Sequence, residues 1–412
     1  MKRRHFLGLL GGLGLAGLGA AALRFWPQQG IWNPCPSAAI PEDLLQHEVV
    51  QAAWQGIDPA RVWDSHCHLA GSGDSGSGAW MHPDMESPLH PIRYTQLQFY
   101  LNAACVDADA ASLDRDYVQR LRRLLQGFHP RSRALLLAFD YRHDDQGRPR
   151  PEESVIYVPN HYAAALQRRY PEHFEWIASI HPYREDCVEA VDEAVKLGAR
   201  AVKWLPSVMG IDPASRQCDR FYAALKRHDL PLLTHVGSEY ALQVLGSHLP
   251  NHPLRLRYPL DQGVKVIIAH CASIGSGPDL DKGPHGPQRH NIEFFARLMA
   301  DPHYEGLLFG DIAAITQINR RLEVLRRIFS HQEWHGRLLH GSDYPLPGVM
   351  PLFSLSRYVE AGALSGEAAR VLSEIRPYNP LLFDFVLKRS LAFDGAGLAP
   401  AIFETAPFFS AV

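Results

Sequence analysis

The stretch Val62-Trp63-Asp64-Ser65-His66-Cys67-His68 carries the clearest indication of the fold. It reads as a short buried strand that ends in a His-x-His pair. Because residues two apart on a strand point to the same side, we expect Asp64, His66 and His68 to share one face. Two imidazoles at this spacing, near the end of a strand, can bind one metal ion from one side. A His-x-His pair is a weak signal by itself, so its context decides its meaning.

Other apolar runs end in the same way, with one titratable residue at the carboxyl end. Three of them reach His235, His270 and Asp343. Alternation predicts that His270 shares a face with Val266 and Ile268. A strand buried on both faces offers no favourable place for an unpaired carboxylate, so Asp343 needs a cation or strong hydrogen-bond donors.

Short apolar runs alternate with helical patterns along most of the chain. This order favours a parallel sheet, and eight is the number of strands that closes a (β/α)8 barrel. A doubly wound open sheet is the alternative, although no G-x-G-x-x-G motif follows a strand. Helical patterns cover 187–197, 220–228 and 318–329. The eight candidate strands span 61–69, 133–141, 175–181, 200–205, 230–236, 264–271, 306–312 and 337–344.

The predicted fold class is α/β, with a distorted (β/α)8 TIM barrel over residues 61–345. Residues 24–60 have weak periodicity and read as an N-terminal extension. Residues 346–412 contain helical patterns, and we expect this C-terminal segment to pack on the barrel. Two long loops, 71–91 and 273–289, follow the first and sixth strands, where a barrel carries its chemistry, so they are candidate substrate-binding loops.

The composition excludes several classes of protein. Of 412 residues, 46% are hydrophobic and 21% are charged, which argues against wholesale disorder. The formal net charge is −3, so no basic field indicates binding to nucleic acid. We therefore expect a small-molecule substrate and no nucleic-acid partner. The 22 histidines matter only if they lie at chemically meaningful positions.

The first 23 residues read as an export signal. Arg3-Arg4 is followed by an apolar run from Phe6 to Leu23, with small residues suited to cleavage near its end. The paired arginines are typical of the twin-arginine export machinery, which carries folded proteins. A plain secretory signal or an uncleaved membrane anchor is the alternative. We expect export to the periplasm, where an uncleaved leader would tether the chain to the membrane.

The six cysteines form no C-x-x-C pair, so a thiolate zinc site is not indicated. An oxidising compartment would permit disulfides, but the sequence does not assign a pairing. The oligomeric state is likewise open.

The order of these motifs resembles the amidohydrolase superfamily. The segments G-A-R-A-V-K-W-L-P, L-L-T-H-V-G, I-I-A-H-C and H-G-S-D-Y-P are similar to the branch that includes aminocarboxymuconate-semialdehyde decarboxylase. The resemblance implies a distorted barrel with one or two divalent metal ions, zinc being the expected one. It implies that His66, His68 and His235 are ligands and that His270 is a second-metal ligand or a catalytic imidazole. Asp343 would bind metal and carry the proton.

Two further strand-end residues have several interpretations. Lys203 ends the fourth strand, and the resemblance implies either a carboxylated lysine that bridges two ions or a contact with an anionic substrate group; a structural lysine is the third possibility. His181 ends the third strand and either lines the substrate pocket or is a satisfied interior histidine. Asp140 and Asp311, on the second and seventh strands, are similar cases.

The expected activity is metal-dependent hydrolysis of an amide, ester or lactone bond. The metal would activate a water molecule, Asp343 would move its proton, and a neutral His270 that is not a ligand would stabilise the oxyanion. One alternative is non-oxidative decarboxylation of a small unsaturated or aromatic acid, which an arginine in the pocket would favour. Another is a non-catalytic exported metal-binding barrel.

Overall fold

The computed structural model describes residues 29–239, 241–242 and 247–410. The export leader predicted over 1–23 lies outside these residues, as does the beginning of the predicted extension. Among the described residues, no helix is both long and apolar enough to cross a bilayer.

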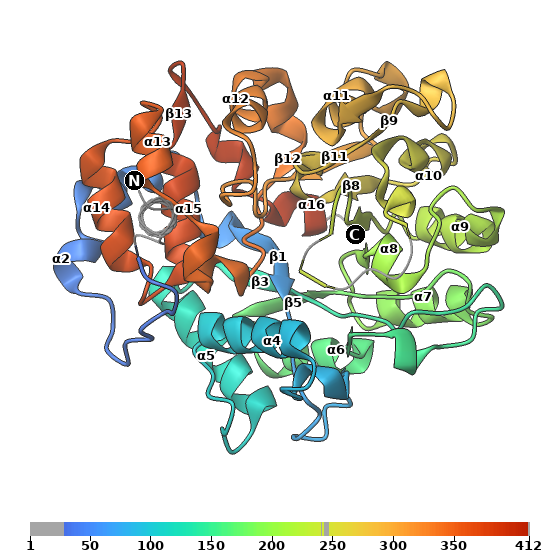
Figure 1. The fold of residues 1–412 in the computed structure, drawn as a ribbon, viewed down its shortest axis with the longest axis horizontal. Helices are drawn as coiled ribbons and strands as arrows, with labels where there is room; N and C mark the ends of the chain where they lie inside the picture. Colours follow the sequence, from blue (N-terminus) through green and yellow to red (C-terminus); the bar gives the residue numbers. More distant parts are fainter. Residues whose placement is uncertain (1–28, 240, 243–246, 411–412) are drawn as a thin grey trace, which may run out of the picture.

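Within the described residues, eight short parallel strands form the barrel, and each overlaps one of the predicted strands. Figure 1 shows strands at the centre of the molecule with helices around them. They pair as two sheets, β1-β3-β5 and β6-β7-β8-β11-β12. Single parallel bridges, Ala178 to Val202 and Cys67 to Tyr344, join the sheets at both edges, so the strand order returns to β1 and the barrel closes. The strands are β1 (Trp63–His68), β3 (Arg133–Leu137), β5 (Phe174–Ile177), β6 (Val202–Trp204), β7 (Leu232–Thr234), β8 (Val266–Ile268), β11 (Leu308–Asp311) and β12 (Leu338–Leu339).

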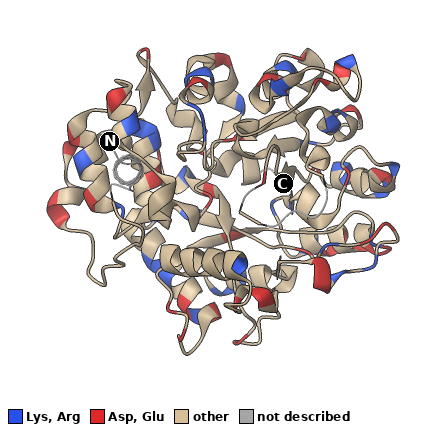
Figure 2. Ribbon diagram, in the orientation of Figure 1, with Lys and Arg blue, Asp and Glu red and all other residues tan. Residues whose placement is uncertain are grey.

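Helices follow the strands and surround the barrel, and basic and acidic residues are interspersed along them (Figure 2). Two predicted helices are confirmed within a residue at each end, and the third begins at Leu322 rather than Ile318. The four residues before it belong to a loop in which the Ile318 amide donates to Leu352 O at 2.8 Å. The outer helices are α4 (Pro91–Ala104), α5 (Leu113–Phe128), α6 (Asn160–Arg169), α7 (Cys187–Lys196), α8 (Pro206–Met209), α9 (Asp219–Arg227), α10 (Arg257–Asp261), α11 (Asn291–Met299) and α12 (Leu322–Ser330).

In the described part of the chain, three small two-stranded sheets lie outside the barrel. β2 (Trp80–Met81) pairs with β4 (Ile156–Tyr157), which ties the long loop after β1 to the loop after β3. The loop after β8 folds into a hairpin of β9 (Ser276–Pro278) and β10 (Gln288–His290). The third hairpin lies near the C-terminus and consists of β13 (Ala392–Phe393) and β14 (Ala396–Gly397).

The C-terminal segment does more than pack on the outside of the barrel. Its last helix, α16 (Ala406–Ser410), contributes Ala406 and Phe409 to the apolar cluster inside the barrel. The same cluster contains Trp63, the first residue of β1. The helix therefore fills the end of the barrel opposite to the carboxyl ends of the strands, and only the other end remains for a site.

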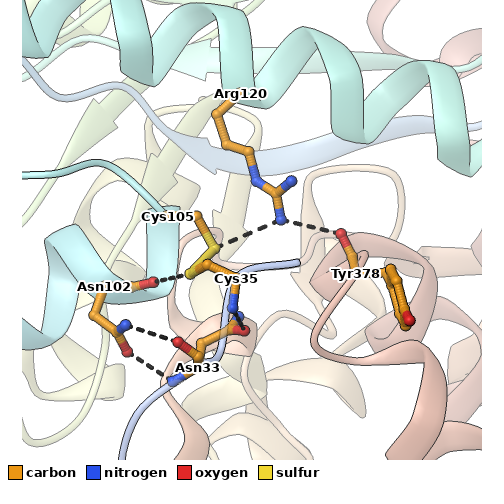
Figure 3. Close-up of a disulfide and its surroundings, with 6 residues drawn as sticks. All are labelled: Asn33, Cys35, Asn102, Cys105, Arg120 and Tyr378. Atoms are coloured by element: carbon orange, nitrogen blue, oxygen red, sulfur yellow. Dashed lines mark hydrogen bonds between the residues drawn. A yellow bond between two sulfur atoms is a disulfide. The ribbon is translucent and has the colours of Figure 1, made fainter. Parts of the chain in front are cut away.

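The C-terminal segment forms helices α13 (Ser356–Glu360), α14 (Gly366–Ile375) and α15 (Pro380–Ser390), and the N-terminal extension packs on the last two. Its helices α2 (Glu42–Leu45) and α3 (Glu48–Ala53) contact α14 and α15 respectively. A Cys35–Cys105 disulfide joins the extension to the end of α4, and Asn33 and Asn102 exchange two hydrogen bonds beside it (Figure 3). The remaining four cysteines are free and buried.

Candidate metal centre

All six predicted metal-binding and catalytic residues line one cavity of about 800 Å³. They come from five strand ends that are far apart in the sequence, and the parallel order of the barrel brings these ends together. The six are His66, His68, Lys203, His235, His270 and Asp343.

The first donor group consists of His66, His68 and Asp343, whose ligand atoms all lie within 4.8 Å of one another. Asp343 Oδ1 lies 3.1 Å from His68 Nε2 and 3.5 Å from His66 Nε2. Burial alone would raise the pKa of Asp343, but the two imidazoles outweigh it and hold the pKa well below its usual range. The carboxylate is therefore ionised and ready to bind a cation.

The predicted common face of β1 is only partly correct. The register of β1 against β3 shifts between Asp64 and Cys67, and such an irregularity interrupts the alternation of a strand. His66 and His68 reach the cavity, but Asp64 does not line it. Its carboxylate instead accepts a hydrogen bond at 2.8 Å from the backbone amide of Ser342 and contacts the Ser342 hydroxyl. Asp64 thus connects β1 to the last strand.

The His270 side chain points into the cavity because of a backbone turn that strand alternation did not predict. Val266 and Ile268 belong to the outer apolar cluster, so the face predicted for them and His270 is wrong. The backbone of His270 adopts a left-handed conformation with φ of 57°, and this turn carries the imidazole inward. Asp343 is also left-handed, with φ of 63°. Such conformations are unfavourable for residues other than glycine and recur at functional sites.

The His270 ring has a defined tautomer. Its Nδ1 lies 3.0 Å from Ala313 O, and because a carbonyl only accepts, Nδ1 carries the proton. Burial lowers the pKa of His270 well below its usual value, so the ring is neutral. The other nitrogen, Nε2, therefore offers a lone pair. A lone pair suits a metal ligand or a proton acceptor, and the predicted role of His270 as an oxyanion donor does not fit this tautomer.

Asp311 is the main residue that sequence reasoning undervalued. It is fully buried at the end of β11, and its Oδ2 accepts a hydrogen bond of 2.8 Å from His66 Nδ1. Its Oδ1 accepts from the amides of His270, at 2.7 Å, and Ala313, at 3.0 Å. Burial alone would raise the pKa of Asp311, but its close contact and hydrogen bond with His66 hold it well below its usual range. A carboxylate behind an imidazole in this way orients a ligand toward a metal.

Asp311 also belongs to a second donor group. His66, His270 and Asp311 have ligand atoms within 4.8 Å of one another, and all three are buried. The only signal for Asp311 in the sequence was its place at the end of the seventh strand.

His235 lies in the cavity beside His270, with ring centroids 5.3 Å apart, but it is in neither donor group. Its Nε2 lies 3.3 Å from Glu239 Oε2. Glu239 is buried and lines the cavity, although no pattern in the sequence indicated it. Ligation by His235 stays a prediction.

Lys203 is fully buried and its Nζ lies 3.2 Å from His66 Nε2. Since Asp311 holds the proton of His66 on Nδ1, the ammonium donates to Nε2. Burial lowers the pKa of Lys203 to about 8, although Asp311 and Asp343 act in the opposite direction. Lys203 thus occupies the nitrogen that a metal ion would need.

The structure does not place His181 in the substrate pocket. β5 ends at Ile177, and beyond it the alternation no longer holds. The His181 Nε2 donates to Met209 O at 3.0 Å, and its Nδ1 accepts from the Tyr183 amide at 3.2 Å. Both ring nitrogens are satisfied, so His181 is an interior histidine, which was the second of the two interpretations.

The rest of the cavity wall is largely apolar. α4 and the long loop after β1 supply much of it, including Met85, Ile92 and Phe99, which agrees with the prediction of a binding loop at 71–91. Of the predicted loop at 273–289, only Ile274 lines the cavity, because the remainder folds away as the β9–β10 hairpin. A buried arginine, Arg320, also reaches the wall.

The donor set fits a divalent metal ion. It offers imidazole nitrogens and an ionised carboxylate, which are the ligands that zinc and related ions take. Burial, aided by the charge of Lys203, lowers the pKa of His66, and a neutral imidazole is the form that binds metal. The Asp311–His66 hydrogen bond fixes the orientation of that ligand.

A family model described as Amidohydrolase matches residues 63–351, more than half of the chain. The similar solved structures include an uncharacterised TIM-barrel protein from Bordetella bronchiseptica, at 14% identity over 76% of this chain and 98% of that one, with a TM-score of 0.45. A probable 2-pyrone-4,6-dicarboxylic acid hydrolase from Acinetobacter baumannii has 14% identity over 73% of this chain and 90% of that one, with a TM-score of 0.41. A 5-carboxyvanillate decarboxylase from Novosphingobium aromaticivorans has 10% identity over 79% and 94%, with a TM-score of 0.40. Among curated proteins, none matches this sequence.

Proposed function

This chain belongs to the amidohydrolase family, and we propose that it is a metal-dependent hydrolase that cleaves an amide, ester or lactone bond of a small molecule. The observation that carries the proposal is the group of His66, His68 and Asp343 at the carboxyl ends of the barrel strands. A divalent ion held there supplies Lewis acidity, since it lowers the pKa of a coordinated water and polarises a carbonyl group.

Asp343 is the residue suited to move the proton. Its Oδ1 faces both imidazoles, whereas its Oδ2 makes no hydrogen bond to any residue that the structure describes. In the proposed reaction Oδ2 accepts the proton that the attacking water loses and later delivers it to the leaving group. His270 Nε2, with its lone pair, binds the ion or serves as a second proton acceptor.

Zinc is the ion that we propose, as one or two ions per chain. The donor set of nitrogen and oxygen atoms supports zinc. Lys203 and a metal ion compete for the lone pair on His66 Nε2. Metal binding therefore requires the Lys203 amine to turn away, lose its proton or become carboxylated, and a carboxylated Lys203 would favour two ions. Metal analysis counts the ions per chain, and mass measurement of the native chain detects a carboxylated Lys203.

One observation favours a second candidate function. Arg320 in the cavity wall is the kind of residue that would hold the carboxylate of a decarboxylase substrate. The candidate is non-oxidative decarboxylation of a small unsaturated or aromatic acid at the same metal centre. Product analysis distinguishes the two reactions, because decarboxylation releases carbon dioxide and hydrolysis releases an acid with an alcohol or amine.

The decisive experiment measures metal content and turnover on a panel of small esters, lactones, amides and aromatic acids. We expect zinc-dependent hydrolysis, and we expect Asp343→Asn to lose it. A variant that keeps both its metal and normal turnover would refute the proton role of Asp343. Metal without any turnover would favour the non-catalytic barrel, and release of carbon dioxide would favour the decarboxylase.

We also propose that the chain is exported to the periplasm through the twin-arginine machinery. The Cys35–Cys105 disulfide supports an oxidising compartment, because such bonds are rare in the cytosol. Fractionation of cells that carry the wild-type chain or a chain with Arg3 and Arg4 replaced by Lys tests the route. Cytoplasmic retention of the variant alone is the expected result.

A further inference from the structure

We propose that Arg320 forms an anion-binding subsite in the cavity, so that the substrate is an amphipathic molecule whose carboxylate binds Arg320 while its apolar body fills the cavity. This inference rests on the proposed function, because it describes the substrate of that same site. It is carried by a buried guanidinium that has no acidic partner among the residues that the structure describes, and by the apolar wall around it.

Arg320 lies in the loop between β11 and α12, lines the cavity and is 6% exposed. Its Nη1 donates to Gln317 Oε1 and to Asn319 Oδ1, both at 2.6 Å, and both acceptors are neutral amides. Its Nε is buried without a hydrogen-bond partner in the described part of the chain. Buried arginines are rare unless they are paired with an anion. The missing partner is therefore the part that a ligand can supply.

The guanidinium keeps its charge at neutral pH. Burial lowers the pKa of Arg320 to about 10, and the negative charges of Asp343 and Glu239 act in the opposite direction. Glu239 does not pair with it, because its Oε1 accepts from the amides of Ala241 and Leu242 and its Oε2 faces His235. The cavity thus presents an unneutralised positive charge near Arg320.

The loop that carries Arg320 is held in place by α13. Arg357 donates to Arg320 O at 2.6 Å and to Ile318 O at 2.9 Å. The neighbouring Tyr358 hydroxyl donates to Thr316 O at 2.8 Å. Such bracing pre-organises the guanidinium, and a group that is already in place loses less free energy when it binds a ligand.

Gln317 adds a second donor to the subsite. It is 3% exposed and lines the cavity, and its Nε2 has no partner among the described residues. Its Oε1 is already used by Arg320. The polar atoms left free on these two side chains are therefore donors only, which selects an anion over a cation or a neutral amide.

The volume and the apolar wall of the cavity indicate the size and polarity of the part of the ligand beyond its carboxylate. About 800 Å³ is the size of a pocket for a drug-sized molecule, far more than a carboxylate needs. The wall includes Leu101, Leu242 and Leu352, and Ile92 extends it toward solvent with a side chain that is 77% exposed. An aryl or alkyl body attached to the carboxylate matches this surface.

The test compares 4-phenylbutanoate with its neutral partner 4-phenylbutanamide by calorimetric titration of the full-length protein. Each titration is performed on metal-loaded and on chelator-treated protein, because a carboxylate can also bind a metal ion. We expect the carboxylate to bind about 10- to 100-fold more tightly than the amide, as a charge-assisted hydrogen bond provides. The preference should persist without metal and disappear in Arg320→Gln.

Arg326→Gln is the matched control, because Arg326 lies on the outside of α12 with a half-exposed side chain that pairs with Asp394. It should keep the preference for the carboxylate. If Arg320→Gln does not fold, Arg320→Lys replaces it, and this variant should weaken the preference since an ammonium lacks the guanidinium fork. Equal binding of the two probes, or a preference that survives in Arg320→Gln, would overturn the inference.

This titration needs no turnover, so its outcome is separate from that of the hydrolase panel. A protein that hydrolyses neutral esters without any preference for carboxylates would retain the proposed function and lose the subsite. A protein that shows the preference but no turnover would keep the subsite and lose the hydrolase.

Discussion

Asp311 Oδ2 lies 2.8 Å from Nδ1 of His66, and neither side chain is more than 1% exposed. The two residues lie on β11 and β1, and their hydrogen bond holds the proton of His66 on Nδ1. It therefore leaves the lone pair on Nε2, which accepts from Lys203 and which a metal ion would have to take over.

We predict that Asp311→Asn lowers the affinity for the metal by about 10- to 100-fold, because an amide is a weaker acceptor and no longer fixes the His66 ring. Competition with a chromogenic chelator measures this affinity. Asp394→Asn is the control, since that carboxylate is largely exposed and pairs with Arg326. An Asp311→Asn protein that binds metal as the wild type does would show that the carboxylate has no orienting role.

Gly341 lies directly against His66. A Cβ atom on Gly341 would lie 2.6 Å from Cβ of His66, a separation that real side chains do not reach. We predict that Gly341→Ala lowers the free energy of unfolding by about 1–3 kcal/mol through overpacking and also weakens metal binding. Urea denaturation and the chelator assay measure the two effects.

The matched control for Gly341 is Gly366→Ala, because no atom of the described residues lies within 4 Å of the added Cβ at that position. Gly366 is the first residue of α14, where alanine is favoured over glycine, so this variant should lower neither stability nor metal affinity. If the two alanine variants behave alike, the close approach of Gly341 to His66 is not what constrains this position.

The Cys35–Cys105 disulfide closes a separation of 70 residues between the extension and the end of α4 (Figure 3). In the chain-entropy account, a loop of this length contributes about 4 kcal/mol to the free energy of unfolding. We expect Cys35→Ser to lose up to that amount in urea denaturation. Cys105→Ser and the double variant should lose the same amount, because each removes the same bond. Additive losses would mean that the cysteines act separately.

The acid sensitivity of the fold should depend partly on His181. Burial lowers the pKa of His181 well below its usual value, and the neighbouring His143 and Arg184 add to this effect. Below about pH 6.5 the unfolded chain then binds a proton that the folded chain does not, so stability falls as the pH falls.

We predict that His181→Gln reduces the loss of stability between pH 6.5 and pH 5 by up to about 1.4 kcal/mol per pH unit. Urea denaturation at several pH values measures the slope. His303→Gln, at a side chain that is 87% exposed, is the control and should not change it. An unchanged slope in His181→Gln would show that the imidazole becomes protonated in the folded state.

Much of the barrel could be predicted because strand and helix patterns are local. All eight barrel strands overlap the apolar runs that predicted them, since the apolar pattern of a strand can be recognised within a few consecutive residues. The side-chain directions predicted from alternation were wrong where the backbone leaves the strand conformation. They were wrong at the irregularity in β1, at the left-handed turn of His270 and beyond the end of β5 at His181.

The donors of the candidate site could be predicted, but their partners could not. Asp311 and Glu239 stand at ordinary positions in the sequence, and nothing local distinguishes them from satisfied interior carboxylates. Arg320 falls within a stretch with a helical pattern, and only the fold shows that this stretch is a loop against the cavity.

The sequence by itself determined the alternation of strands and helices and placed an imidazole or a carboxylate at the right strand ends, because both properties depend on a few consecutive residues. The tertiary structure alone decided which nitrogen of each histidine is free, which carboxylate stands behind His66, and that Arg320 is buried without an anion. These features depend on contacts between distant segments: His66 meets Lys203 across 137 residues and Asp311 across 245. Hydrogen bonds and burial between such segments exist only after the barrel has closed.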